Sequence, residues 1–190
     1  EDIAGLYQLD GKTYAIPKDY DTIGLWYNKT MFDQAGISYP DESWTWETFA
    51  EAAGKLTKED GSQYGFTSPA SFNQDGYYNL IYSMGGSVLS DDKTQSNWNS
   101  PETVQAMNWW YDNLVAKAMP TQQVMAENTP DVMLGSGKAA MVLQGSWMVA
   151  AMKGNEYIVE NCDVAVLPKS DSGKRISIYN GLGWAASAKG

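Results

Sequence analysis

Residues 137–147 of the chain read Gly137-Lys138-Ala139-Ala140-Met141-Val142-Leu143-Gln144-Gly145-Ser146-Trp147. The apolar run 139–144 inside this stretch predicts a buried strand, because it is short and is bounded by glycines. Residues 146–153 predict a helix that follows the strand directly. Trp147 therefore stands at a strand-to-helix junction, where an aromatic ring can present its face to a cleft.

Strands and helices alternate on both sides of this stretch. Short runs of β-branched and aromatic residues predict further strands at 13–17, 22–27, 64–67, 163–167 and 176–179. Capping signals and apolar periodicity predict helices at 30–35, at 46–56, over about ten residues before Gly85, from Pro101 to about 118, and from Pro130 to near Gly135. This interleaving favours an α/β layer architecture.

Two of the predicted helices carry a recognisable apolar face. The helix capped by Thr45 places apolar residues at helical spacing, namely Trp46, Phe49, Ala50, Ala53 and Leu56. The helix that begins at Ser100-Pro101-Glu102 is expected to bury Val104, Met107, Tyr111, Leu114, Val115 and Ala118. We interpret Trp109 and Trp110 on the same helix as partly exposed packing residues.

The composition of the chain excludes several classes of function. Its 190 residues include 13 basic and 23 acidic side chains, so the net charge is −10. Such an excess of acid repels phosphate, which makes nucleic acid and anionic membranes poor partners. Histidine is absent, which excludes His-based catalytic triads and His metal ligands. Because Cys162 is the single cysteine, the sequence predicts no intrachain disulfide and no cysteine zinc cluster. We expect neither a metal site nor a cofactor.

The aromatic residues favour types that carry a polar atom. The chain holds 8 Trp and 12 Tyr but only 4 Phe. Such side chains combine an apolar face with a hydrogen-bonding group, which suits a half-polar ligand. By contrast, Gly135-Ser136-Gly137-Lys138 only looks like a phosphate-binding loop. Val132 and Ala139 stand where that motif requires Gly and Ser or Thr, so we interpret the stretch as a helix stop followed by a strand.

Three segments together resemble a known family. They are 10–17 continuing through 21–29 and 32–37 to 44–49, then Gly85–Ser90 followed by Ser100–Glu102, and finally 137–147 with Val166-Leu167-Pro168 beyond. In this order and spacing they closely resemble the family 1 extracellular solute-binding proteins. Those are the sugar-capturing components of bacterial ABC importers and are relatives of the maltose-binding protein.

The resemblance implies an α/β fold of the type II periplasmic-binding-protein kind, in which two lobes hold a ligand between them. It implies that this chain is mainly the second lobe and is a piece of a longer protein. Residues 1–23 would be hinge-proximal strands from the first lobe, 24–168 the second lobe, and 169–190 a return strand toward the first lobe.

The resemblance also points to ligand-binding residues, which we expect at Asp21, Tyr20, Gln74, Tyr77, Trp147, Asn180 and Gly181. Trp147 corresponds to the main sugar-stacking aromatic of the family, and the alternative is that it belongs to the core. Asp21 lies at the proposed hinge, where a carboxylate can accept two hydroxyl hydrogen bonds. The alternative is a turn residue or a partner of Lys18, and Tyr20 could share the task.

The remaining candidates have structural alternatives of similar weight. Gln74 and Tyr77 lie in a segment that supplies ligand contacts in the family, but they could equally be a helix cap and a core aromatic. Asn180-Gly181 follows the last predicted strand, where an amide could both donate to and accept from a sugar hydroxyl. The same dipeptide is also a strong turn signal.

The leading hypothesis is a non-enzymatic carbohydrate-binding lobe that captures a mono- or oligosaccharide. Its partners would be the sugar and the membrane permease subunits of an ABC transporter, with the protein acting as a monomer. The expected location is extracytoplasmic, as a periplasmic protein or a cell-surface lipoprotein. Two alternatives remain open: a glycoside hydrolase that uses aromatic subsites and a carboxylate pair, and an interaction module whose aromatics contact a protein.

Overall fold

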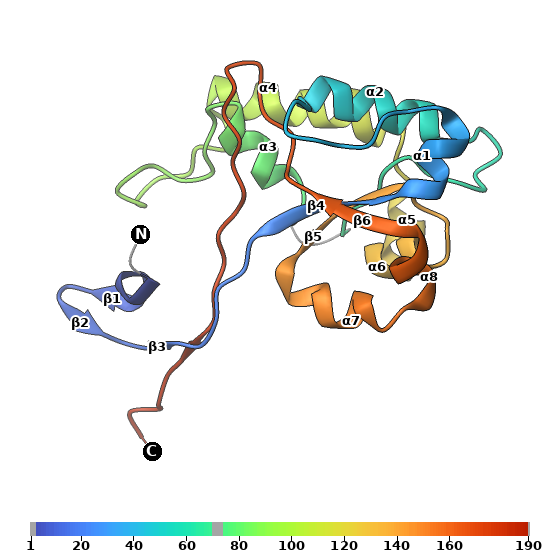
Figure 1. The fold of residues 1–190 in the computed structure, drawn as a ribbon. Coiled ribbons are helices and arrows are strands. Elements are labelled where there is room, and N and C mark those ends of the chain that lie inside the picture. Colours follow the sequence, from blue (N-terminus) through green and yellow to red (C-terminus); the bar gives the residue numbers. More distant parts are fainter. Residues whose placement is uncertain (1–2, 70–73, 190) are drawn as a thin grey trace.

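The computed structural model describes residues 3–69 and 74–189. Its centre is a three-stranded antiparallel sheet of strand order β5-β4-β6. Helices cover both faces of this sheet, and an arm of short strands extends from one end of the body (Figure 1). Within the described residues, no helix is both long enough and apolar enough to cross a bilayer.

The central strand β4 (Ile23–Asn28) fixes the register of the sheet. It pairs with β5 (Met141–Gly145) from Ile23 opposite Gly145 to Tyr27 opposite Met141. On its other edge it pairs with β6 (Cys162–Ala165), with Leu25 opposite Ala165. Successive side chains of a strand point to opposite faces, so β4 contributes to a separate apolar core on each side of the sheet.

One face of the sheet is covered by the larger aromatic core. The covering elements are α1 (Lys29–Ala35), α2 (Trp46–Leu56), α3 (Tyr77–Ser83), α4 (Pro101–Trp110) and the π-helical turn η2 (Tyr111–Val115). Fully buried Phe66 joins these helices, because its ring centroid lies 5.0 Å from that of Phe49 and 5.6 Å from that of Trp110.

The other face packs against a smaller core. Its elements are α5 (Gln122–Glu127), α6 (Pro130–Gly135), η3 (Ser146–Met148), α7 (Val149–Lys153) and α8 (Glu156–Asn161). Met133, Val142 and Ile158 meet beneath the sheet in this core. Cys162 is buried there as a free thiol.

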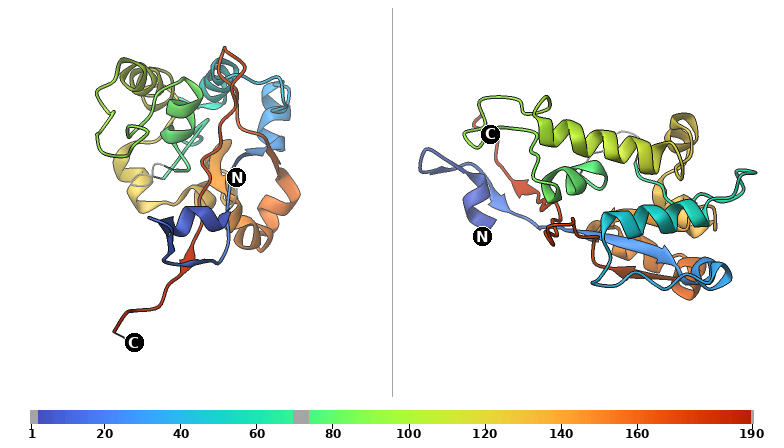
Figure 2. Two further views of the ribbon diagram at one scale, coloured as in Figure 1. Left: turned by 90° about the vertical axis from the view of Figure 1, so that its left-hand side faces the viewer. Right: turned by 90° about the horizontal axis from the view of Figure 1, so that it is seen from above.

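The arm joins the two ends of the described chain. It contains η1 (Ile3–Tyr7), β1 (Gln8–Leu9), β2 (Lys12–Thr13) and β3 (Ile16–Pro17), and β3 pairs in antiparallel fashion with β7 (Gly183–Trp184). The incoming and outgoing segments therefore run side by side away from the body, as Figure 2 shows from two further directions.

Most of the predicted helix boundaries are confirmed by their caps. The side chains of Asn28, Thr45 and Ser100 accept hydrogen bonds from backbone amides at the starts of α1, α2 and α4. Gly36 ends α1 in the left-handed conformation, with a φ of 65°. The start of α6 is confirmed at Pro130, although Thr129 makes no side-chain capping bond.

Several predicted strands are wrong or only partly right. Residues 176–179 are not a strand, because the Ile23 amide donates to the Ser177 side-chain oxygen (2.8 Å) in place of a backbone ladder. Residues 64–67 make only two isolated parallel bridges to the β5 side of the sheet. The predicted strand at 13–17 is divided between β2 and β3. Helices α5 and α8 were not predicted.

The buried face predicted for the helix from Pro101 is only partly right. Leu114 and Ala118 are buried, and Met107 and Val115 pack partly buried against the core. Val104 is 43% exposed and Tyr111 is 61% exposed, while Thr103, Ala106 and Trp110 are buried. Trp110 is buried because its indole packs edge-on against Phe66 in the aromatic core, which turns Tyr111 outward. The apolar face predicted for α2 is confirmed, except that Ala50 is only partly buried.

The close approach of residue 65 to α2 generates a prediction. A Cβ added to Gly65 would lie 1.7 Å from the carbonyl oxygen of Ala53, whereas one added to Gly54 would meet nothing within 4 Å. We expect Gly65→Ala to lower the free energy of unfolding by about 2 kcal/mol or more, since backbone must move. Gly54→Ala should raise it by roughly 0.5–1 kcal/mol through helix propensity.

Urea denaturation of both variants measures this difference. An unfolding free energy of Gly65→Ala equal to that of the unmodified chain would contradict the packing described for this segment.

Candidate functional site

A cavity of about 500 Å³ opens where the β5 edge meets the starts of α3 and α6. Its walls are lined by Pro69, Gln74, Asp75, Thr129, Pro130, Asp131, Gln144, Trp147 and Met148. The walls combine one large aromatic ring with amide, hydroxyl and carboxylate groups. A concave surface of this mixed kind is typical of small-ligand sites.

The indole of Trp147 is held over the end of β5 by the absence of a side chain at residue 145. A Cβ on Gly145 would lie only 2.1–2.3 Å from three ring carbons of Trp147. The Gly145 amide donates to Oε1 of Gln144 (3.0 Å), which fixes the local backbone. Trp147 is nevertheless 37% exposed, so its ring packs on the glycine and remains accessible.

Asp75 is the most unusual polar group of the cavity. The residue is only 4% exposed, and within residues 3–69 and 74–189 no donor reaches its Oδ1 atom. Burial raises the pKa of its carboxyl group to about 6, because desolvation disfavours the ionised form. Asp75 therefore combines limited exposure to water with an unused acceptor at a cavity wall.

Asn79 on α3 holds this wall in place. Its Nδ2 donates to the carbonyl oxygens of Gln74 (2.8 Å) and Gly76 (3.0 Å), and its Oδ1 accepts from the Ile178 amide (2.8 Å). One fully buried amide thus ties the segment of Gln74 and Asp75 to the return segment after β6.

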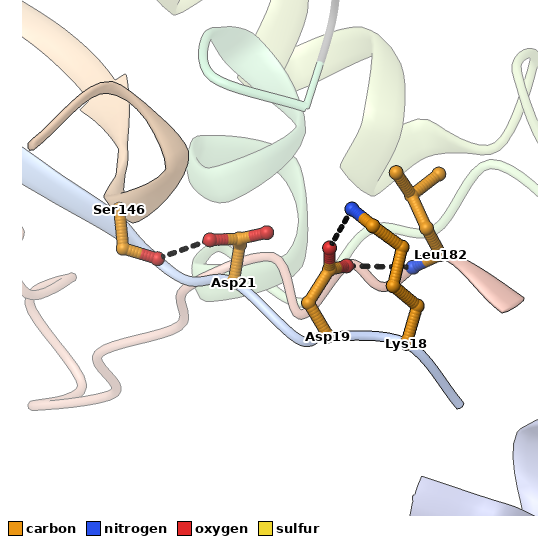
Figure 3. Close-up of polar contacts among 5 residues, drawn as sticks. All are labelled: Lys18, Asp19, Asp21, Ser146 and Leu182. Atoms are coloured by element: carbon orange, nitrogen blue, oxygen red, sulfur yellow. Dashed lines mark hydrogen bonds and ion pairs between the residues drawn. The ribbon is translucent and has the colours of Figure 1, made fainter. Parts of the chain in front are cut away.

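Two segments cross beside the cavity and are joined through Asp21. Its backbone bridges Asn180 in both directions, with N–O distances of 2.7 and 3.1 Å. The Ser146 hydroxyl donates to Oδ1 of Asp21 (2.6 Å), as Figure 3 shows. Since Ser146 directly precedes Trp147, this bond links the crossing segments to the aromatic wall.

Further contacts hold the same crossing on the side away from the cavity. Asp19 accepts from the Leu182 amide (3.1 Å) and pairs with Lys18, and all three residues are drawn in Figure 3. The Lys18 hydrogen bond keeps the pKa of the Asp19 carboxyl below its usual value. The backbone oxygen of Asp19 also lies 2.8 Å from where a Cβ at Gly181 would stand, which leaves room for glycine only.

The structure distributes the predicted site residues over three places. Gln74 and Trp147 line the cavity. Asp21, Tyr20, Asn180 and Gly181 lie on the crossing segments, where the rings of Tyr20 and Tyr179 have centroids 5.7 Å apart. Tyr77 is absent from the cavity wall and packs against Tyr78, Trp98 and Trp110 at 5.4–6.1 Å. Their roles in ligand binding remain predictions.

Sequence reasoning missed three residues that the structure places at the site. Asp75 stands next to Gln74 and could have been found, since an acidic residue in a segment expected to contact ligand is itself a signal. Ser146 and Asn79 gave no such signal, because their partners Asp21 and Ile178 are separated from them by 125 and 99 positions.

A second hollow of about 450 Å³ lies between α2 and the α4–η2 helix. Its walls are Glu47, Ala50, Glu51, Gly54, Lys55, Trp109, Asn113 and Lys117. Trp109 donates its indole N–H to Glu47 (3.1 Å), so its polar atom is already engaged. Within the described part of the chain, no group of three or more acidic or cysteine side chains could hold a metal ion.

The contact between Gly145 and Trp147 yields a testable coupling. Gly145 has φ and ψ of −78° and 158°, which alanine also adopts, so only the indole opposes a Cβ there. Gly145→Ala should therefore lower the unfolding free energy by about 1–3 kcal/mol in the unmodified chain. In a Trp147→Ala background the same change should cost less than about 0.5 kcal/mol.

Denaturation of the four proteins in this double-mutant cycle measures the coupling. Equal costs of Gly145→Ala in both backgrounds would contradict the described position of the Trp147 ring.

The buried Asp75 carboxyl makes stability depend on pH. Its pKa of about 6 lies above the unfolded value of 3.8, so its stabilising effect is complete below pH 3.8 and is lost as the pH rises through 6. A shift of this size corresponds to at most about 3 kcal/mol. Asp75→Asn should remove this loss, whereas the exposed control Asp112→Asn should retain it.

Urea midpoints measured between pH 4 and pH 8 test this expectation. If the stability of Asp75→Asn declined with rising pH as much as that of the unmodified chain, the pH dependence would come from other groups.

The chain matches the family model of the bacterial extracellular solute-binding protein over residues 2–190. It is 29% identical to the maltodextrin-binding protein of Bacillus subtilis, over 94% of this chain and 43% of that protein. An ABC substrate-binding protein from Listeria monocytogenes, solved in complex with cycloalternan, superposes with a TM-score of 0.83 at 27% identity. That match covers 98% of this chain and 47% of the other.

A solute-binding protein from Thermotoga lettingae bound to α-D-tagatose superposes with a TM-score of 0.79 at 25% identity, over 95% of this chain and 47% of the other. The chain thus spans less than half the length of these relatives. Their fold is that of the maltose-binding type, as the sequence predicted. The chain therefore belongs to the bacterial extracellular solute-binding protein family.

Proposed function

We propose that the chain is the carbohydrate-binding part of the capture protein of a bacterial ABC sugar importer. The observation that carries this proposal is the Trp147 indole, held against Gly145 at the wall of a cavity of about 500 Å³. A sugar ring has apolar C–H faces that stack on such an indole, while its hydroxyl groups need polar partners. Gln74, Asp75 and Thr129 on the facing walls supply such groups.

The relatives support the carbohydrate class of the ligand. The names or titles of those described above give maltodextrin, cycloalternan and tagatose. These molecules differ in size but share many hydroxyl groups and no charge. We propose the same class, a mono- or oligosaccharide, as the ligand of this chain.

The crossing segments support a two-lobed parent. Residues 1–23 and 169–190 would lead to the first lobe, residues 24–168 would form the second, and Asp21 and Asn180 would lie at the hinge between them. Ligand binding would close the lobes by bending there, and the closed form would dock on the membrane permease as a monomer. Membership of an extracellular family supports an extracytoplasmic location, in the periplasm or at the cell surface as a lipoprotein.

Binding without catalysis is the proposed activity. The family and the solved relatives are binding proteins. A glycoside hydrolase would need two carboxyl groups about 5–10 Å apart across the sugar bond. Since Asp75 and Asp131 line the same cavity, release of reducing sugar is included in the test of the function.

Substitution of Trp147 tests the proposed function. Isothermal titration of the 190-residue chain with maltotriose, galactose and mannitol should show binding of at least one ligand. Trp147→Ala should weaken that binding at least about tenfold, since ring stacking and apolar contact are lost. The control Tyr111→Ala removes an exposed aromatic outside the cavity and should leave the affinity unchanged.

Two outcomes would count against the proposal. If Trp147→Ala bound the ligand with unchanged affinity, the Trp147 ring would not be part of the binding site. Reducing sugar released during prolonged incubation with maltotriose would indicate an enzyme instead.

A further inference from the structure

The glycine at residue 181 is required by the close crossing of the two chain ends. A Cβ there would lie 2.8 Å from the backbone oxygen of Asp19 and 3.1 Å from the hydroxyl oxygen of Tyr7. The preceding residue is Asn180, and residues 180–181 form the single Asn-Gly dipeptide of the sequence. Packing therefore sets beside an asparagine the one residue type that has no side chain to shield its backbone nitrogen.

The hydrogen bonds of the crossing leave this backbone nitrogen unused. Asn180 exchanges two backbone hydrogen bonds with Asp21, and Leu182 uses both its backbone N–H and its carbonyl oxygen in further bonds. Antiparallel bonds of this kind fall on alternate residues, so the Gly181 N–H lies on the side away from the partner segment. No described residue accepts a hydrogen bond from it.

The side-chain amide of Asn180 is equally without a partner in the described parts of the chain, because all the bonds of this residue run through its backbone. The residue is also only partly buried. By contrast, the side chains of Asn28, Asn79 and Asn155 are each fixed by hydrogen bonds to the backbone. No such bond holds the Asn180 side chain away from the nitrogen of Gly181.

We propose that Asn180 is a site of spontaneous covalent modification, in which the backbone nitrogen of Gly181 attacks the side-chain carbonyl carbon, Cγ. The new N–Cγ bond closes a succinimide ring, the backbone nitrogen loses its proton, and the Cγ–Nδ2 bond breaks as ammonia leaves. Water then opens the ring at either carbonyl carbon. The products are aspartate, or isoaspartate in which the backbone runs through Cβ, and nothing is oxidised or reduced.

A second asparagine of the chain lacks this arrangement. Asn99 is exposed and is followed by Ser100, but the Ser100 amide donates to the carbonyl oxygen of Asn97 (3.0 Å). The Ser100 side chain also caps α4. Attack by the Ser100 nitrogen would therefore require local opening at the start of α4. Asn99 is the natural comparison for Asn180 within the same molecule.

The modification would weaken the crossing of the two chain ends. Either product adds a carboxylate to a crossing that already holds Asp19 and Asp21. Isoaspartate also lengthens the backbone between residues 180 and 181, so that Leu182 loses its register with Lys18. The reaction needs no ligand, and the proposal is therefore independent of the function proposed above.

Incubation of the 190-residue chain in neutral buffer, followed by trypsin digestion and mass spectrometry, tests the proposal. Cleavage after Arg175 and Lys189 releases residues 176–189, in which Asn180 carries the single side-chain amide. The mass of this peptide should rise by the difference between a hydroxyl and an amino group. Asn180→Gln should suppress the change, because its longer side chain does not form the succinimide ring.

The same incubation in urea gives the rate of each site without the fold. Folding should slow the conversion of Asn99 at least about tenfold more than that of Asn180, because only the Ser100 amide must break a hydrogen bond. In chain enriched in isoaspartate, the Asp21 and Lys18 amides should exchange hydrogen at least about tenfold faster than in the unmodified chain.

Three results would overturn the proposal. The first is a folded chain whose 176–189 peptide keeps its mass over a period that converts this peptide in urea. The second is equal slowing of Asn99 and Asn180 by folding. The third is a mass change that persists in Asn180→Gln, once thermal unfolding has shown that this variant keeps the fold. Unchanged hydrogen exchange at Asp21 and Lys18 would overturn the effect on the crossing.

Discussion

The pairing of β4 with β5 positions the whole site. Ile23 lies opposite Gly145, so the first residue of one strand meets the last residue of the other. Asp21, two residues before Ile23, and Ser146, directly after Gly145, therefore emerge at the same edge of the sheet and form a hydrogen bond. A slip of one residue would exchange the two faces of β4 and move apolar side chains out of both cores. Burial of those side chains thus fixes the register, and the register fixes where Trp147 lies.

Polar groups complete the site at some cost to stability. The side-chain amide of Asn79 donates to two backbone carbonyl oxygens and accepts from one backbone N–H. These bonds join the cavity wall to the return segment. Asp75 has no comparable partner for its Oδ1 among the described residues. Among the described residues, the side chain of Asn79 is therefore fully hydrogen-bonded, whereas that of Asp75 is not. The fold places both on the same short segment.

The sequence predicted the fold better than it predicted the site. Local signals were sufficient where they act within a few residues, as with the caps of Asn28 and Thr45 and the apolar face of α2. They failed for part of the helix from Pro101, where Tyr111 is exposed and Trp110 is buried. The burial of Trp110 depends on its contact with Phe66, which is distant in the sequence. Likewise, Ser146 and Asn79 act through partners that only the folded chain brings near.

The central claim is that ligand binds against Trp147 at the edge set by this register. The most direct measurement is the indole N–H region of an amide-correlation NMR spectrum, recorded while maltotriose is added to ¹⁵N-labelled chain. Trp147 and Trp109 line the two separate hollows and are assigned by substitution. The account predicts that the Trp147 signal shifts as maltotriose is added, until the binding site is saturated, while the Trp109 signal does not move. A shift of Trp109 with Trp147 unmoved would contradict it.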